Sequence, residues 1–530
     1  MFRVVAAFAF SVSFLLVTTS NNLLAQAKSR DVSIGLQAAI TSIDPHYHNI
    51  GPNNGLLRHV FEALVKTDDN QKFIPGLATS WRAIDDLTWE FKLRKNVRFH
   101  DGSPFTADDV SFTLKRVPTV PNSPSSFSTF VRSIVDVKIV DPHTVVLKTA
   151  TANVLLPSDL STVLIVSKAV GEKANTEDYN SGRAAIGTGA YRFQEYMPNQ
   201  KIILKANYGY WGGEEPWDVI TFKMLTNPAA RVAALLSGDV QLIETVPTAD
   251  IAKLSKDPKY NLADKISNRV IYVHLNQSTE KSPPFVFGKD GKPLDKNPFR
   301  DARVRKALSM AINRDAIVSR VMEGKAQSAA QLLPDFFYGT SKKLKPMKFD
   351  VDGAKKLLAE AGYPNGFAMT LHGPNNRYIN DANIAQALAQ MYTRIGIDVK
   401  VETMPSAVYF TRATKLEFGY MLLGWGTESG EQGSAMRSLL ATFNSAKGMG
   451  VTNRGRYSNP AFDALLATAL VTMDDKKREA AIIKAAEMVM DDVGLIPLHY
   501  EVSTWAATKG LKYTARTDQY TLAMGLKPTK

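Results

Sequence analysis

Short runs of β-branched and aromatic residues recur along the first half of the chain, and this pattern is typical of strands. Long helical patterns are scarce in the same half. We therefore predict a strand-rich first half, with strands near 32–37, 89–93, 144–149, 201–205, 219–225 and 270–276.

The pattern changes at Phe299, beyond which apolar residues return at helical spacing. Between Arg300 and Met322 the apolar side chains fall on one helical face, and Gly324 favours a stop. Helices and strands then alternate, which indicates a sheet covered by helices with ligand crevices at the carboxyl ends of its strands. The predicted helices are 351–361, 381–395, 460–470 and 474–489, and the predicted strands are 367–371, 397–402 and 496–500.

Two stretches have the composition of loops. Lys281–Pro298 is rich in lysine, proline and glycine, and we interpret it as a crossing between domains. Gly424–Gly433 combines glycines with acidic residues, and we interpret it as part of a site. The sequence has no tandem repeat and no low-complexity linker, so we expect the domains to be joined by chain crossings.

The N-terminus has the three parts of a secretory signal. A basic start with Arg3 precedes an apolar stretch from Val4 to Val17, and a polar stretch then ends in Ala25-Gln26-Ala27. The apolar run is shorter than the ~20 residues that a membrane-spanning helix needs, so we predict cleavage after Ala27. The expected location of the mature protein is the periplasm.

Composition excludes several classes of protein. The 530 residues contain no cysteine, which excludes disulfides, thiolate metal sites, a cysteine nucleophile and a lipid-modified N-terminal cysteine. The formal charge of +13 is compatible with nucleic acid, an anionic membrane, an acidic ligand or solubility alone. Export and the lack of RNP-like or zinc-finger patterns argue against nucleic acid.

Common catalytic signatures are absent: the sequence has no H-E-x-x-H, no G-x-S-x-G and no G-K-[ST]. One S-x-x-K, from Ser278 to Lys281, leaves a secreted serine hydrolase of the penicillin-recognising type as an alternative, although no K-T-G accompanies it. His46 and His48 have a spacing that could ligate a metal, but polar loop residues after a proline explain them better. We predict no cofactor, no metal and no enzymatic activity.

Ordered motifs along nearly the whole mature chain carry a resemblance. They resemble those of the family 5 extracellular solute-binding proteins, the dipeptide- and oligopeptide-binding components of ABC importers. The motifs are IPGLATSW (74–81), TWEFKLR (88–94), VRFHDGSPFTADDV (97–110), GTGAY (187–191), ALLSGD (234–239), DARVRKAL (301–308), LLAEAGY (357–363), YSNPAFD (457–463) and IPL (496–498).

The resemblance implies an α/β fold of the cluster C periplasmic binding proteins, with two α/β lobes, a hinge and an extra domain. The expected boundaries are 28–75, 187–285 and 500–530 for lobe one, 76–186 for the extra domain and 286–499 for lobe two.

The implied function is that of a monomeric periplasmic receptor, which captures a peptide or peptide-like solute between its lobes and delivers it to a membrane permease. Other members of the family bind nickel chelates, glutathione, opines and sugar conjugates, so the ligand stays open. A chemoreceptor or chaperone adaptor on the same fold is an alternative.

Arg377 is the first candidate for the site. It follows a strand-like run and precedes a helix, where crevice residues occur, and its planar fork suits a carboxylate. It also matches the arginine that the resemblance assigns to the ligand carboxylate. Asn380 in the same loop, and Tyr191 in the GTGAY motif, are further candidates.

The second part of the expected site is the loop Gly424–Glu431. In the dipeptide binders the corresponding loop after Gly-Trp carries aspartates, one of which holds the ligand ammonium. Here the acidic residues are Glu428 and Glu431, and the longer side chain of Glu places the carboxylate farther out. Trp425 is expected to offer the ligand an apolar wall.

Overall fold

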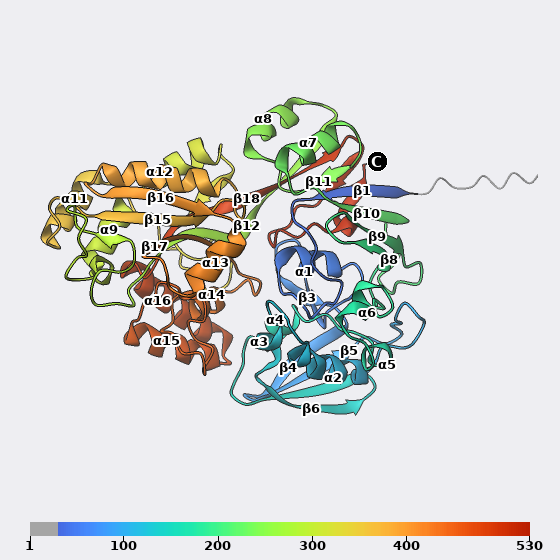
Figure 1. Ribbon diagram of the computed structural model, residues 1–530. Helices are drawn as coiled ribbons and strands as arrows, with labels where there is room; N and C mark the ends of the chain where they lie inside the picture. Colours follow the sequence, from blue (N-terminus) through green and yellow to red (C-terminus); the bar gives the residue numbers. More distant parts are fainter. Residues whose placement is uncertain (1–29, 530) are drawn as a thin grey trace, which may run out of the picture.

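The computed structural model describes residues 30–529. The predicted signal sequence, residues 1–27, and its cleavage site after Ala27 lie outside this range. Figure 1 shows two lobes side by side and a further domain attached to the lobe that holds the first strand. We refer to these parts as the first lobe, the second lobe and the insert domain.

Two long antiparallel strands, β12 (Tyr260–Leu275) and β18 (Ile496–Thr508), run through both lobes (Figure 1). Within the first lobe β18 pairs with β11 (Leu242–Ile243), and within the second lobe β12 pairs with β17 (Tyr420–Gly426). The register between the two strands is interrupted between Ile266 and Val270. One sheet of 12 strands therefore extends across both lobes, with an irregularity where the lobes meet.

The first lobe is built on β1 (Asp31–Leu36), which lies parallel to β10 (Val219–Met224) and β11. Ile34, Phe222 and Trp505 are buried in its core. Its other elements are α1 (Gly51–Leu57), β2 (Val65–Thr67), β3 (Phe73–Pro75), α5 (Lys168–Gly171), α6 (Thr176–Asn180), β8 (Tyr191–Met197), β9 (Lys201–Ala206), β10 (Val219–Met224), α7 (Pro228–Leu236), β11 (Leu242–Ile243), α8 (Thr248–Lys256), β19 (Leu511–Tyr513), η4 (Ala523–Gly525) and β20 (Leu526–Pro528), after β1 (Asp31–Leu36).

The insert domain is a four-stranded antiparallel sheet in the order β4-β5-β7-β6, packed against helix α2. Phe91, Val110 and Leu147 lie in its core. Thr106 and Asp109 form a capping box that fixes the start of α2. The elements are β4 (Ala78–Asp85), β5 (Thr88–Leu93), α2 (Ala107–Arg116), η1 (Val117–Thr119), α3 (Ser128–Val131), β6 (Ile134–Asp141), β7 (Thr144–Thr149) and α4 (Leu156–Leu160).

The second lobe has the predicted sheet with helices on both faces. Strand β15 lies parallel to β16 and β17, and the successive β17 residues Leu422 and Leu423 are buried in two different clusters, one on each face. The elements are β13 (Val286–Phe287), η2 (Pro298–Arg300), α9 (Ala302–Met310), α10 (Arg314–Ala316), η3 (Ile317–Val321), β14 (Ala326–Ser328), α11 (Val351–Glu360), β15 (Ala368–Pro374), α12 (Asp381–Thr393), β16 (Asp398–Met404), α13 (Ser406–Thr414), β17 (Tyr420–Gly426), α14 (Gln432–Leu439), α15 (Pro460–Val471) and α16 (Asp475–Asp491). The α/β fold expected from the alternation and the resemblance is thus confirmed.

The GTGAY motif marks a close approach between two backbones. A Cβ atom on Gly187 would lie 1.9 Å from the carbonyl oxygen of Val60, and the amide of Gly189 donates to that oxygen at 3.0 Å. Any side chain at Gly187 would collide with this contact, which explains the glycine. The motif connects the insert domain to the first lobe.

Two details differ from the sequence prediction. The helix predicted over 300–322 is broken, because the Asn313 side chain accepts from the Ala316 amide at 2.9 Å and caps a new helix there. The chain also enters the second lobe within β12, ahead of the loop Lys281–Pro298 that we interpreted as the crossing. Because one continuous strand runs through both lobes, the amino-acid composition does not change at the point where the chain crosses between them.

Buried histidines are a feature of all three parts. Burial lowers the pKa of His46, His59, His100 and His372 to about 4 and that of His274 and His499 to about 3. The unfolded chain binds protons near the ordinary histidine pKa of about 6.5. Because the unfolded state then carries more protons than the folded state, acidification below that pH destabilises the fold.

We predict that the melting temperature falls steeply between pH 6.5 and pH 4. In His499→Leu the fall should be smaller, because this fully buried ring has no hydrogen-bond partner within the described residues and its protonation opposes folding. Calorimetry at intervals of half a pH unit measures the effect. His143→Leu, on the turn between β6 and β7, is the control, and equal acid sensitivity of wild type and His499→Leu would contradict the prediction.

Candidate functional site

Four segments meet where the chain passes between the lobes. The Thr427 amide, after β17, donates to the carbonyl of Asn268 in the interruption of β12 at 3.3 Å, and the Asn268 amide donates to the carbonyl of Thr517 at 2.9 Å. Thr517 in turn donates from its amide to the carbonyl of Asp69 at 2.9 Å. The loop after β17 is therefore held against the first lobe through the irregular stretch of β12.

Arg377 lies in the turn between β15 and α12, in contact with water. Its amide donates to Asp381 at 2.9 Å, which fixes the turn, and its guanidinium lies 5.4 Å from the centre of the Tyr378 ring. No described residue forms a hydrogen bond or an ion pair with this guanidinium. Loss of hydration and the nearby Arg269 charge lower the pKa of Arg377. The side chain is thus a cation without a protein partner.

The neighbouring charges are satisfied within the protein. Arg269 lies 3.5 Å from Glu501 and donates to Gln519 at 2.8 Å. Glu501 also accepts from the Ile379 amide at 3.1 Å and from Gln519 at 3.2 Å. Arg269 and Glu501 therefore neutralise each other, and Arg377 retains its charge for another partner.

Trp425 is partly buried at the end of β17 and packs against the second-lobe core, while its indole N–H has no partner among the described residues. Next to it, Gly424 has no room for a side chain, because a Cβ would lie 2.7 Å from the Tyr378 ring. The Tyr378 hydroxyl donates to the Gly424 carbonyl at 3.1 Å. This contact positions the Arg377 turn against the end of β17.

Glu428 is already bound within the protein. The Tyr520 hydroxyl donates to its carboxylate at 2.5 Å, and burial raises the pKa of Glu428. The Gln71 side chain donates to the carbonyl oxygens of Thr427 and Glu428 at 2.7 and 2.6 Å. Glu428 therefore lies at the junction of the two lobes.

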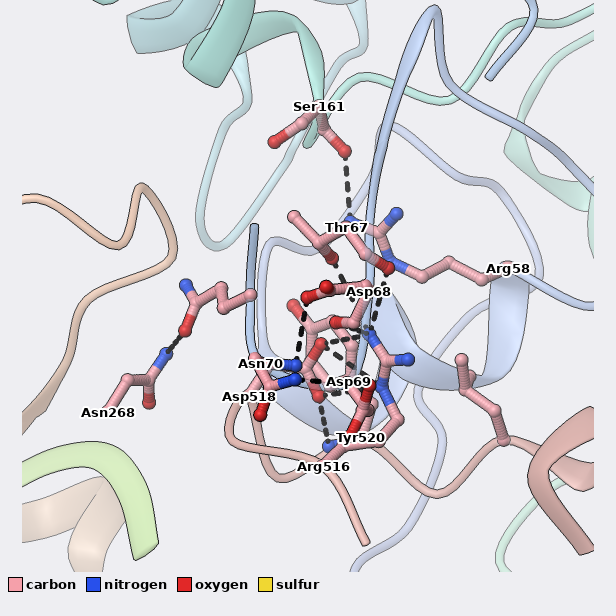
Figure 2. A network of polar contacts seen from close by, with 12 residues as sticks. Arg58, Thr67, Asp68, Asp69, Asn70, Ser161, Asn268, Arg516, Asp518 and Tyr520 are labelled. Carbon is pink, nitrogen blue, oxygen red and sulfur yellow. Dashed lines mark hydrogen bonds and ion pairs between the residues drawn. The ribbon is translucent and has the colours of Figure 1, made fainter. Parts of the chain in front are cut away.

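The wall of the first lobe that holds Tyr520 is itself fixed by an arginine (Figure 2). The Arg516 guanidinium donates to Asp518 at 2.6 Å and to the Asp68 carbonyl at 3.0 Å. Asp518 accepts from the Tyr520 amide at 3.0 Å. Arg58, also drawn in Figure 2, donates to the Ser161 carbonyl at 2.9 Å and so links this wall to the insert domain.

Three further predicted site residues already have contacts within the protein: Glu431, Tyr191 and Asn380. Glu431 accepts from Arg478 at 2.6 Å within the second lobe. Tyr191 is completely buried in the first lobe, near the His59 ring. Asn380 donates to Thr248 of α8 at 3.0 Å and to the Val321 carbonyl at 2.8 Å, so it links the two lobes.

Several buried polar atoms around the loop after β17 have no hydrogen-bond partner within the described residues. Buried polar groups are normally hydrogen-bonded to protein or to ordered water, so these atoms are available to bind a water molecule or a polar solute. They are Trp425 Nε1, Thr427 Oγ1, Ser429 Oγ, Glu431 Oε1, Gln432 Oε1 and Arg437 Nε.

Sequence reasoning missed Gln71, Asn268, Arg269, Glu501 and Tyr520. None of them lies in a recognisable motif. The pairing of β12 with β18 brings Asn268, Arg269 and Glu501 together, whereas Gln71 and Tyr520 reach the loop after β17 from separate loops of the first lobe. The nearest sequence signal is the Ile496–Leu498 motif, which identifies the strand that carries Glu501.

The hydrolase alternative receives no support. The Ser278 hydroxyl donates to Asn276 at 2.6 Å, and no hydrogen bond joins the Ser278 and Lys281 side chains within the described residues. Residues 30–529 contain no group of three His, Cys, Asp or Glu side chains that could hold a metal. Within the same residues, every helix is too short or too polar to cross a membrane.

Comparison with known proteins agrees with this geometry. The profile of the bacterial extracellular solute-binding proteins, family 5, matches residues 72–447. The dipeptide-binding protein of Escherichia coli is 30% identical over 446 residues, 79% of each chain. Heme-binding protein A of Haemophilus influenzae is 29% identical over 481 residues, covering 85% of this chain and 83% of the relative.

Solved structures share the fold. The periplasmic binding protein DppA of Helicobacter pylori, in complex with the peptide STSA, superposes with a TM-score of 0.79 at 24% identity, covering 94% of this chain and 98% of that one. The chain belongs to the family 5 extracellular solute-binding proteins. It is accordingly a binding protein of the kind that serves ABC importers, as the motifs predicted.

The lobe junction leads to a first test of the site. Gln71→Ala removes two hydrogen bonds to the loop after β17, worth about 1–3 kcal/mol together. We expect amide exchange in residues 424–433 to become at least about fivefold faster, which hydrogen–deuterium exchange mass spectrometry measures. Gln200→Ala, at an exposed turn of the first lobe, is the matched control. Unchanged exchange would show that Gln71 does not hold the loop.

Proposed function

We propose that this protein is a periplasmic receptor that captures a peptide or peptide-like solute between its two lobes and delivers it to the permease of an ABC importer. The Arg377 guanidinium, which lacks a protein partner beside the lobe junction, is the observation that carries the proposal. In this proposal the receptor acts as a monomer, without catalysis and without nucleic acid.

Arg377 binds a carboxylate of the solute in a bidentate manner through its planar guanidinium group. Trp425, at the end of the strand whose Gly424 contacts Tyr378, has a partly buried ring and an indole N–H without a partner among the described residues, so it is a second candidate contact for the solute. Glu428 and the first-lobe wall around Tyr520 close the same region. Enclosure between the lobes removes water and strengthens each polar contact.

The energies indicate how much Arg377 can contribute. A hydrogen bond to a charged group adds about 1.5–3 kcal/mol, whereas micromolar affinity needs about 8 kcal/mol. A bidentate carboxylate contact therefore supplies only part of the affinity. In this proposal the polar atoms of the loop after β17 and the Trp425 ring supply the remainder.

Native mass spectrometry of protein purified from its own periplasm tests the proposal most directly. We expect a retained solute whose fragments contain amide bonds and a carboxylate. The apo protein, refolded after denaturation, should then recapture peptides of similar mass from a casein digest. A retained solute without a carboxylate would contradict the proposal.

Arg377→Ala should weaken binding of a captured peptide at least about tenfold, because about 1.4 kcal/mol or more of charged hydrogen bonding is lost. Titration calorimetry gives the affinity. Arg394→Ala, an exposed arginine near the far end of α12, should bind like the wild type. Equal affinities for wild type and Arg377→Ala would remove Arg377 from the site.

A further inference from the structure

A cavity of about 190 Å³ lies within the second lobe, and we refer to it as the Arg314 cavity. Its lining comes from the end of α9, the start of α10, the segment after β14, the loop before α11, the end of α16 and the start of β18. It shares no residue with the proposed peptide site at the lobe junction. A cavity of about 150 Å³ is large enough for benzene, so this one has room for a molecule of that size.

Arg314 supplies a buried positive charge to this cavity. The residue is 4% exposed, and its guanidinium donates to the carbonyl oxygens of Pro497 at 2.9 Å and Ser309 at 3.1 Å and to the Ser309 hydroxyl at 2.9 Å. A longer contact, at 3.4 Å, reaches the carbonyl oxygen of Met347. All of these acceptors are neutral, and the guanidinium forms no ion pair with any residue between 30 and 529.

Arg305 on the neighbouring helix α9 shows how a similar charge is compensated. Its guanidinium also donates to main-chain carbonyl oxygens, but in addition it binds the carboxylate of Asp492 at 2.5 Å. Asp315, the acidic residue next to Arg314 along the chain, instead accepts from the Ser328 hydroxyl at 3.0 Å. A buried charge is costly without a counter-charge, so Arg314 favours an anion in the adjoining cavity.

The rest of the lining is mostly apolar, and it includes Ala329, Ala330, Met347, Met490, Val493 and Leu495. Two further charged residues of the lining, Lys345 and Asp491, are exposed and carry opposite charges. The net charge of the lining is therefore that of Arg314. Pockets that combine apolar walls with a few polar groups bind small molecules and fix their orientation, so this lining suits an apolar body with a single negative charge.

The loop before α11, which forms one side of the cavity, is strongly basic. Lys342, Lys343, Lys345 and Lys348 are all exposed, and no acidic residue stands between them in the sequence. A cluster of charges of one sign raises the local concentration of ions of the other sign. The approach to the cavity therefore favours anions over neutral molecules and cations.

We propose that the Arg314 cavity is a second binding site, which takes a small apolar monocarboxylate with its carboxylate on Arg314 and its apolar body against the side chains around Ala330. A guanidinium has five N–H groups. Three of those of Arg314 make short hydrogen bonds within the protein, which leaves two for a carboxylate. This inference does not rest on the proposed function, because the cavity and the peptide site have no residue in common.

Benzoate is the probe for this site, and benzamide, which has nearly the same shape without the charge, is its neutral counterpart. The Arg377→Ala variant serves as the background, so that the proposed peptide site does not bind the benzoate carboxylate. The protein is refolded after denaturation to remove retained solutes. A ligand-observed NMR titration at pH 7.5 and low ionic strength should show at least tenfold tighter binding of benzoate than of benzamide.

Two substitutions in this background test the position of the ligand. Ala330→Leu fills part of the cavity and should weaken benzoate binding at least fivefold, whereas Ala480→Leu, at an exposed position of α16, is the matched control and should leave it unchanged. Arg314→Gln removes the charge and should reduce the preference for benzoate over benzamide below threefold. Because Arg314 also binds main-chain carbonyl oxygens, a thermal melt must show that this variant folds, and Ala330→Leu decides the test if it does not.

Three results would overturn the proposal: equal affinities for benzoate and benzamide, no binding of either, or unchanged benzoate binding in Ala330→Leu. Benzoate binding that occurs in the wild type and is lost in Arg377→Ala would place the ligand at the lobe junction, which overturns the second site and supports the peptide site. The receptor role is tested separately by the retained solute. The two proposals can therefore fail independently.

Discussion

The antiparallel pairing of β12 with β18 is the constraint on which the rest of the structure depends. Each strand belongs to both lobes, so the lobes cannot move independently of each other. Their backbone hydrogen bonds hold the lobes together least at residues 267–269, the wider of the two interruptions of the register. Bending is expected at this interruption, because fewer ladder bonds resist it there.

The same interruption organises the site. Asn268 donates to both Gln71 and the Thr427 carbonyl, at 2.9 and 3.1 Å, and thereby connects the first lobe, the strand and the loop after β17. Arg269 next to it neutralises Glu501. Motion at these residues would shift the polar contacts around Arg377 and Glu428 together, so in the proposed function closure of the lobes would be coupled to binding of the solute.

The sequence predicted those parts of the fold that are specified by a local pattern of residues. The alternation of helices and strands beyond Phe299 predicted the sheet of the second lobe, and the position of Arg377 after a strand and before a helix placed it in the turn before α12. The broken helix after Ala311 could not be read in this way, because the apolar spacing continues across the break. The capping contact of Asn313 overrides that periodicity.

The sequence by itself determined the class of protein, the α/β architecture and the arginine suited to a carboxylate, because each depends on periodicity or on ordered motifs. Only the tertiary structure decided which charges are free. In the sequence Glu428 and Glu431 look available for a ligand ammonium, yet in the structure Tyr520 donates to the first and Arg478 donates to the second. Whether a charged side chain has a partner depends on residues far away along the chain. A local sequence pattern does not identify those residues.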